Sequence, residues 1–196
     1  MTRGFLPLFA LALAIGIGAL AWGTEGFRVV TSEGARRLAV IGDPQPVPGV
    51  PLRDQDGRRF SLADYRGAPV LIEFIYTSCP TLCAVLGDEL QRLAAARRGP
   101  RLLSISFDPE HDDRRALELY GERYGAALPR WRIAAPADQR SLRTLLQRFG
   151  VVAIPDGSGG FVHNGALYFV DSCGRIARIL DPSATPQMIA AGDGAS

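Results

Sequence analysis

The sequence predicts an α/β protein in which a parallel strand–helix–strand unit shares one sheet with a C-terminal hairpin. Two apolar runs of strand length, PVLIEFIY at 69–76 and LLSISF at 102–107, are typical of strands buried on both sides. Leucines at helical spacing lie between them. Near the C-terminus, runs at 166–170 and 176–180 bracket the turn residues 171–174 (DSCG), which indicates a hairpin.

The N-terminal segment is expected to lie outside this folded domain. Residues 5–22, FLPLFALALAIGIGALAW, are uncharged and would reach about 27 Å as a helix, near the hydrocarbon thickness of a bilayer. The length favours a retained transmembrane anchor, whereas the triplet at 19–21 (ALA) favours a signal peptide cleaved there. The domain would then face the bacterial periplasm, either anchored to the inner membrane or secreted.

The remaining chain divides into a linker and one domain. We expect 1–22 to be the anchor or signal segment, 23–46 a connecting linker, and 47–192 the folded domain. The domain would open with a hairpin over 51–67, because Asp56-Gly57 is a turn signal between alternating residues.

A helix is expected after the first buried strand. Pro80 suits its first turn, and apolar residues then recur at helical spacing, namely Leu82, Val85, Leu86, Leu90 and Leu93.

Later elements complete the topology. Asp112 or Asp113 could cap a second helix, 131–134 suits a short strand, and Asp138 could cap a third helix that ends at Gly150. A last short helix is expected over 186–191. Strand, helix, strand, helix, helix and terminal hairpin is the order of a thioredoxin-like fold.

Composition excludes several classes of function. The net charge is only +2 and no basic run is interleaved with aromatic residues, so nucleic-acid binding is not expected. Three cysteines are few for a disulfide-stapled secreted domain, but they suit a reactive or metal-binding pair plus a spare.

The main candidate site is the cysteine pair in YTSCPTLC, at 76–83, where the first buried strand ends and a helix begins. Helix N–H groups and the helix dipole favour a thiolate there, so low pKa values are expected at Cys79 and Cys83. The CxxxC spacing puts both on one helix face, where they can form a redox disulfide or bind one metal ion. Thioredoxin-type redox motifs use CxxC, which favours metal binding here.

His163 is the expected third ligand. It lies in the glycine-rich segment GGFVHNG, and in a thioredoxin-like topology the loop before the terminal hairpin passes near the first helix. Two thiolates and one imidazole form a soft site that suits Cu(I) and can accept Cu(II), whereas zinc usually takes a fourth ligand. His111, flanked by carboxylates in DPEHDD, is expected to be solvated and outside the site.

On these motifs the sequence resembles the SCO/SenC family, the copper-binding assembly factors of cytochrome c oxidase. The resemblance rests on YTSCPTLC, on SISFDPEHD, and on the loop histidine followed by LYFVD. It implies a membrane-anchored metallochaperone that binds copper through Cys79, Cys83 and His163 and delivers it to the oxidase's binuclear copper centre. A copper donor protein and the oxidase subunit that carries this centre would be its partners.

Three positions depart from the family pattern, since Thr81, Ala84 and Val162 stand where an acidic residue, a proline and an aspartate are usual. Without supporting carboxylates, Cu(II) binding is predicted to weaken more than Cu(I) binding.

Alternative functions use the same cysteines. A thiol–disulfide oxidoreductase that reduces oxidase cysteines before metal insertion would need Cys79 and Cys83 but not His163, and a thiol peroxidase is a third hypothesis. Apart from such accessory exchange, we do not expect an enzyme. Cys173 is interpreted as an incidental exposed thiol, with a resolving cysteine or an extra ligand as the alternatives.

Overall fold

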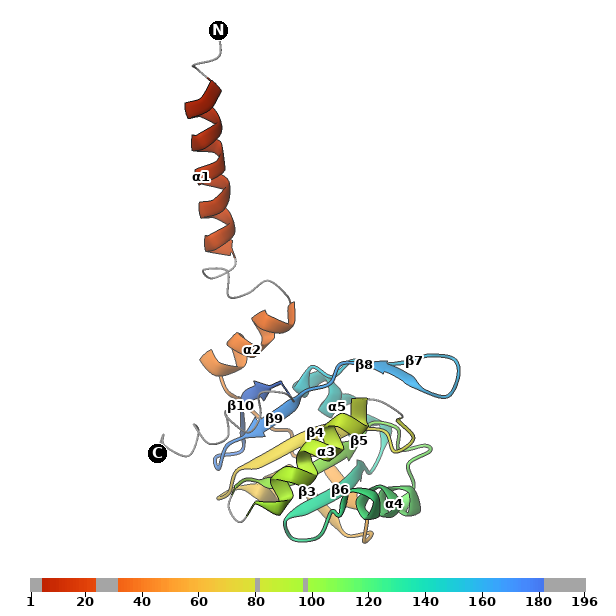
Figure 1. The fold of residues 1–196 in the computed structure, drawn as a ribbon. Helices are drawn as coiled ribbons and strands as arrows, with labels where there is room; N and C mark the ends of the chain where they lie inside the picture. Colours follow the sequence, from red (N-terminus) through yellow and green to blue (C-terminus); the bar gives the residue numbers. More distant parts are fainter. Residues whose placement is uncertain (1–4, 24–31, 80–81, 97–98, 182–196) are drawn as a thin grey trace. The chain divides into compact units, whose positions relative to one another are not determined.

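A computed structural model describes residues 5–23, 32–79, 82–96 and 99–181 (Figure 1). The chain divides into two compact units, residues 1–42 and 43–196. The helix predicted over 186–191 lies outside the described residues.

The described residues of the first unit form two helices, α1 (Phe5–Gly23) and α2 (Ser32–Gly42). The apolar run at 5–22 is therefore helical. In the part of the chain that the structure describes, no helix is both long and apolar enough to cross a membrane. The role of this segment as an anchor or signal peptide stays a prediction.

The predicted linker, residues 23–46, contains a helix and a short strand. Helix α2 occupies part of it because the sequence SEGARRLAVIG is rich in alanine, leucine and arginine, which favour helix. Strand β1 (Gln45–Pro46) lies at its end and pairs with the C-terminal strand of the domain.

The second unit is built on an eight-stranded sheet (Figure 1). Its strands, in spatial order, are β1, β10 (Arg175–Leu180), β9 (Leu167–Val170), β4 (Val70–Ile75), β5 (Arg101–Ser106), β6 (Trp131–Pro136), β2 (Pro51–Asp54) and β3 (Arg59–Ser61). Strands β4, β5 and β6 are parallel, and the other pairs are antiparallel. The predicted parallel unit and terminal hairpin, which meet where β9 pairs with β4, are confirmed.

The opening hairpin is also confirmed. Strands β2 and β3 pair around Gly57, whose φ of 81° is the left-handed conformation that glycine adopts readily. A 3-10 turn, η1 (Leu62–Tyr65), follows and is capped by Ser61.

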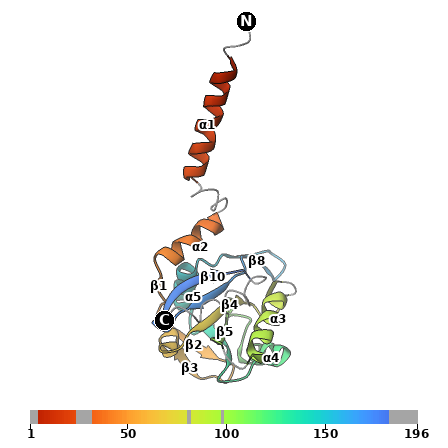
Figure 2. The ribbon, with the colours of Figure 1, turned by 60° about the vertical axis from the view of Figure 1, so that its left-hand side comes forward.

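Helices cover both faces of the sheet: α3 (Leu82–Ala95) and α4 (Arg114–Tyr124) on one, and α5 (Gln139–Phe149) on the other (Figure 2). Neighbouring residues of β4 show why, because side chains alternate along a strand. Phe74 packs against Phe149 of α5, with ring centroids 5.1 Å apart, whereas Glu73 faces Tyr120 of α4.

The helix caps largely match the sequence. Asp138 and Gly150 cap α5 as predicted, and of the two candidates for α4 it is Asp113 that accepts from the Ala116 N–H. On α3, Leu86 and Leu90 are fully buried but Val85 is 57% exposed, because it lies off the stripe formed by residues 83, 86 and 90.

A second, two-stranded sheet was not predicted. Strands β7 (Ala153–Pro155) and β8 (Phe161–His163) form an antiparallel hairpin between α5 and β9. His163 is therefore the last residue of a strand rather than part of a loop. The glycines of GGFVHNG had indicated a loop, and one of them, Gly159, does lie in the connecting turn with positive φ, as does Gly157.

Candidate metal centre

The three predicted ligands meet beyond the end of β4. Nε2 of His163 lies 3.9 Å from Sγ of Cys79 and 3.9 Å from Sγ of Cys83, and the three atoms all lie within 4.8 Å of one another. Three such donors bonded to one ion at about 2.0–2.3 Å would lie roughly 3.5–4 Å apart. The arrangement therefore fits a single first-row metal ion with only small side-chain adjustments.

A tight turn places Cys79, and a buried carboxylate fixes that turn. The Cys79 N–H donates to the Tyr76 carbonyl (3.1 Å). Asp112 accepts from the Thr77 hydroxyl (2.6 Å), from the Thr77 N–H (3.0 Å) and from the Ser106 hydroxyl (2.6 Å). Sequence reasoning offered Asp112 only as a helix cap, so its role in holding this turn was missed.

The thiol environment differs in part from the expectation. Cys79 and Cys83 carry reduced thiols that are not joined in a disulfide, and the two residues are 6% and 1% exposed. Burial raises the pKa of Cys83, so at this residue the loss of solvation outweighs the helix dipole and the predicted low pKa is wrong. The Cys83 N–H does donate to Sγ of Cys79 (3.3 Å), a contact that stabilises a thiolate on Cys79.

The surroundings of His163 favour the neutral imidazole, the form that a metal ion would require. Partial burial lowers its pKa, which favours the uncharged ring. Nδ1 lies 3.4 Å from the Asn164 carbonyl oxygen and can donate its hydrogen there, leaving the lone pair of Nε2 toward the sulfurs.

Asn164 fixes the base of the hairpin that carries His163. Its side chain accepts from the Val152 N–H (2.7 Å) and donates to the Gly150 carbonyl (3.0 Å). It is a second positioning residue that sequence reasoning missed.

Aromatic rings hold His163 in place. Phe107 lies 5.2 Å from the imidazole between ring centroids, and Tyr76 lies 5.8 Å from it; Phe161 packs against both, at 5.2 Å from each. Tyr76 and Phe107 follow the adjacent parallel strands β4 and β5, so their position at one sheet edge could have been read from the sequence.

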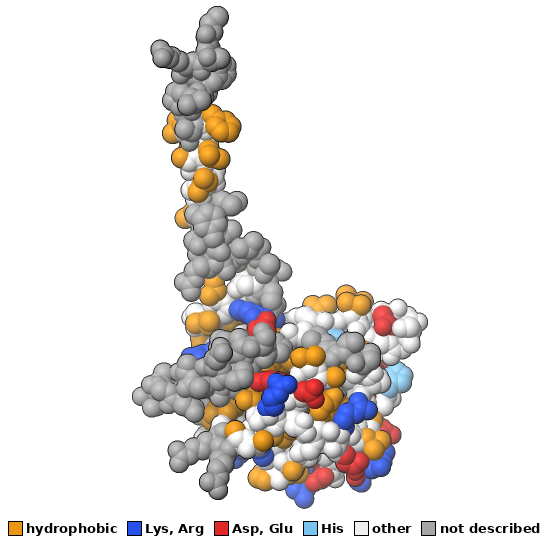
Figure 3. Space-filling model, viewed as in Figure 1, with side chains coloured by type: hydrophobic (Ala, Val, Ile, Leu, Met, Phe, Trp, Pro, Cys, Tyr) orange, Lys and Arg blue, Asp and Glu red, His pale blue; other side chains and the backbone are white. Residues whose placement is uncertain are grey.

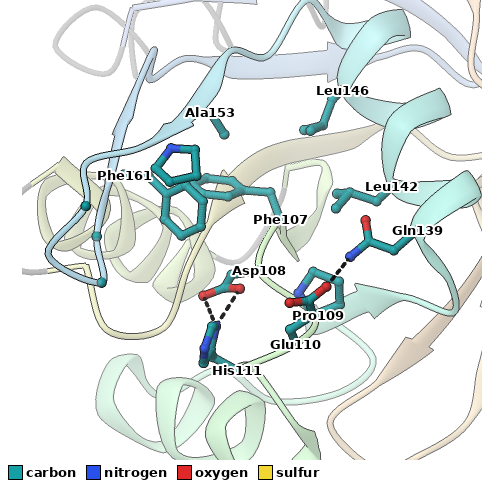
Figure 4. A pocket seen from close by; sticks show the side chains of 14 residues that line it. Phe107, Asp108, Pro109, Glu110, His111, Gln139, Leu142, Leu146, Ala153 and Phe161 are labelled. Atoms are coloured by element: carbon teal, nitrogen blue, oxygen red, sulfur yellow. Dashed lines mark hydrogen bonds and ion pairs between the residues drawn. The ribbon is translucent and has the colours of Figure 1, made fainter.

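A cleft of about 500 Å³ adjoins the site (Figure 4). Phe107 and Phe161 form one wall, and Leu142 and Leu146 of α5 lie opposite. On its rim, His111 is hydrogen-bonded to Asp108 (2.9 Å) and its side chain is 78% exposed. His111 is therefore solvated, as predicted, and is not one of the three clustered donors.

The geometry at position 162 does not support the expectation that an aspartate there would assist Cu(II) binding. Val162 is 67% exposed and precedes His163 in β8, so the two side chains point to opposite faces. Val162 pairs with Ile154, and apolar side chains gather over the β7–β8 hairpin (Figure 3). An aspartate at this position would lie in solvent, directed away from the sulfurs.

Cys173 is exposed, as predicted, and lies at the opposite end of the sheet. The β9–β10 turn that carries it adjoins Val170, which pairs with Val70 at the start of β4, whereas Cys79 follows the end of β4. At about 3.3 Å per residue, the strand separates the two by roughly 16 Å or more. Within one chain, Cys173 is therefore too far from Cys79 and Cys83 to form a disulfide with either or to join the three clustered donors in this arrangement.

The sequence of this domain matches a known family over most of its length. Residues 50–192 match the family SCO1/SenC. The chain belongs to this family. The SCO1 protein homolog of Bacillus subtilis (strain 168) is 28% identical over 133 residues, which are 65% of this chain and 69% of the relative. Protein sco1 of Schizosaccharomyces pombe is 35% identical over 97 residues, but the chain spans only 36% of that protein.

Solved structures of SCO1/SenC proteins share the fold. ScoI of Bradyrhizobium japonicum, solved with copper bound, has a TM-score of 0.62 and 26% identity, covering 76% of this chain and 96% of ScoI. A SCO1/SenC family lipoprotein from Bacillus anthracis has a TM-score of 0.68 at 19% identity, and the likeness covers 77% of this chain and 95% of the lipoprotein. The second likeness establishes the thioredoxin-like SCO fold alone.

Proposed function

We propose that this SCO1/SenC protein binds copper through Cys79, Cys83 and His163 and delivers it to the binuclear copper centre of a cytochrome c oxidase. One observation carries the proposal: two thiols and a neutral imidazole converge within 4.8 Å. This soft donor set suits Cu(I) and can accept Cu(II). The related ScoI, whose solved structure contains copper, supports the choice of metal.

Loading would depend on the redox state of the cysteines. Each thiol must lose its proton to become a ligand, so binding one Cu(I) releases up to two protons. Oxidation of Cys79 and Cys83 to a disulfide, which releases two electrons and two protons, would remove both sulfur ligands. The buried, protonated Cys83 thiol makes proton release part of the affinity.

The cellular setting is part of the same proposal. The run at 5–22 contains no charged residue, which supports an anchor or signal segment and a domain outside the cytoplasm. The lipoprotein relative from Bacillus anthracis is consistent with membrane attachment. A copper donor protein and the oxidase copper-centre subunit would then meet the domain in the periplasm.

Copper binding can be tested on the full chain in detergent, reduced and without oxygen, by titrating Cu(I) against a competing chelator. We expect one equivalent in the wild type and loss of tight binding in Cys79→Ala, Cys83→Ala and His163→Ala. Cys173→Ala is the matched control, because it removes an exposed thiol remote from the site.

The same proteins distinguish the oxidoreductase hypothesis, since exchange with a test disulfide requires the cysteine pair only. We expect His163→Ala to lose copper but to keep exchange. A wild type that binds no copper and exchanges rapidly would replace the copper proposal with the oxidoreductase one.

A further inference from the structure

A carboxyl group that the metal site does not use directly lies in the middle of β4. Glu73 is 0% exposed, and the five other residues of this strand, VLI before it and FI after it, are apolar and buried. Burial raises the pKa of Glu73 to about 8. Its carboxyl is therefore mainly uncharged at neutral pH and can donate as well as accept a hydrogen bond.

Glu73 is hydrogen-bonded on one side only. Ser104, its register partner in β5, donates its hydroxyl hydrogen to Oε1 (2.5 Å) and accepts from Nε1 of Trp131 (2.9 Å). The single hydrogen of Ser104 is thus committed to Glu73. Oε2 of Glu73 is buried and has no hydrogen-bond partner among the described residues.

Tyr120 of α4 connects this carboxyl with the metal site. Its hydroxyl acts on the Glu73 carboxyl and lowers the pKa of Glu73. The same hydroxyl donates to the carbonyl oxygen of Cys83 (3.4 Å). Tyr120 is 3% exposed and its hydroxyl carries one hydrogen, so Cys83 and Glu73 compete for it.

We infer that Glu73 is a positioning residue of the metal site, acting through Tyr120 on Cys83. While the Glu73 carboxyl is uncharged, the Tyr120 hydrogen stays with the Cys83 carbonyl and tethers the first turn of α3. An ionised Glu73 would attract that hydrogen, because a carboxylate is the stronger acceptor. It would also add a negative charge near two thiolates. This inference rests on the metal-binding role proposed above.

Burial keeps the Glu73 carboxyl uncharged because the groups that oppose it are weak. Among the described residues, those that lower its pKa are the neutral hydroxyls of Ser104 from β5 and Tyr120 from α4, neither of which carries a positive charge. Two further titratable groups, the Cys83 thiol of α3 and the Tyr124 hydroxyl of α4, have pKa values that a charge on Glu73 would raise. Protonation of Glu73 therefore removes the repulsion that a Cys83 thiolate, the form that binds a metal, would otherwise meet.

Infrared difference spectroscopy on the full chain tests the link without copper. The spectrum of the oxidised Cys79–Cys83 pair minus that of the reduced pair is recorded at neutral pH. We expect the C=O band of a protonated carboxylic acid, shifted between the two states and missing in Glu73→Gln. Tyr120→Phe should keep the band and abolish the shift. A band from an ionised carboxylate alone, or a band indifferent to the cysteines, would overturn the inference.

Cu(I) affinity supplies the second readout. Residues that orient metal ligands typically contribute about tenfold or more to affinity, so we expect that loss in Tyr120→Phe and in Glu73→Leu. Glu73→Gln keeps an acceptor for Ser104 and a donor toward Tyr120, so we expect this variant to bind Cu(I) as tightly as the wild type. Tyr65→Phe controls for loss of a buried hydroxyl remote from the site, since Tyr65 precedes β4.

Equal losses in Tyr120→Phe and Tyr65→Phe, or in Glu73→Gln and Glu73→Leu, would contradict the inference. A wild type that binds no Cu(I) would refute the proposed function instead, because the infrared measurement depends only on the cysteine pair.

Discussion

The carboxylate of Asp112 accepts hydrogen bonds from both the backbone N–H and the hydroxyl of Thr77, although 35 residues separate the two. Thr77 lies in the turn that aims Cys79 at His163, and Asp112 directly precedes the cap of α4. The pair therefore joins the start of one helix to the turn that carries Cys79, a proposed metal ligand. The effect of this Asp112–Thr77 contact on the proposed metal site can be separated from its effect on α4.

Asp112→Asn tests this link. Three hydrogen-bond donors converge on the carboxylate, and an amide offers one oxygen and a competing donor in its place. We expect a loss of about 2–4 kcal/mol in the free energy of unfolding, measured with urea, together with weaker Cu(I) binding. Asp113→Asn is the control, because asparagine caps a helix as well as aspartate does. Similar losses in both variants would show that the helix terminus, not the turn, is what matters.

Glu73 makes the stability depend on pH. Its pKa is about 8 in the folded protein against 4.5 for an ordinary glutamate, so the folded state holds this proton more tightly. Its contribution is complete below pH 4.5 and is lost as the pH rises toward 8, by about 1.4 kcal/mol per unit.

Urea unfolding at pH 5 and pH 7.5 should therefore show an extra loss of about 3 kcal/mol in the wild type relative to Glu73→Gln. The comparison cancels the contributions of other titrating groups, such as Asp112 and His163, to the pH dependence, because both proteins contain them. Parallel changes in the two proteins would mean that Glu73 has an ordinary pKa.

Gly87 is needed where α3 meets α4. A β-carbon built at this position would lie 2.7 Å from the ring of Tyr124, whereas one at Gly121 of α4 would meet nothing closer than 3.4 Å. Alanine gains up to about 1 kcal/mol over glycine in a helix, but overpacking costs about 1–3 kcal/mol. We expect Gly87→Ala to lower the free energy of unfolding by up to about 2 kcal/mol and Gly121→Ala to leave it unchanged or higher. A Gly87→Ala protein as stable as the wild type would show that Tyr124 can move.

The sequence was sufficient to predict those parts of the fold and of the site for which the local pattern and the topology agree. Apolar runs located β4 and β5, capping residues located α5, and the order of elements brought His163 to the cysteine pair. These inferences needed only strand and helix periodicity and the handed, local connections of an α/β sheet.

The missed features depend on pairing between distant segments. The β7–β8 hairpin is short and glycine-rich, so its strands have little pattern of their own and are defined by Asn164 and by packing on Phe107. The pKa of Cys83 also required the fold, since a helix terminus favours a thiolate and only the observed burial reverses that preference. Neither burial nor cross-chain hydrogen bonding can be read from spacing alone.

Thiol labelling should separate Cys173 from the other two cysteines. Cys173 is exposed in the β9–β10 turn, whereas Cys79 and Cys83 are buried and Cys83 has a raised pKa. Reduced, metal-free full chain treated briefly with a maleimide should therefore gain one label, located at Cys173 by mass mapping and absent in Cys173→Ser.

Copper should protect the pair during longer labelling without changing the rate at Cys173. Equally fast labelling of Cys79 before copper is added would show that the site opens readily to solvent. Because at least a strand length separates Cys173 from the pair, any disulfide it forms should join two chains. Non-reducing electrophoresis after mild oxidation should then show a dimer that Cys173→Ser abolishes and Cys79→Ala retains.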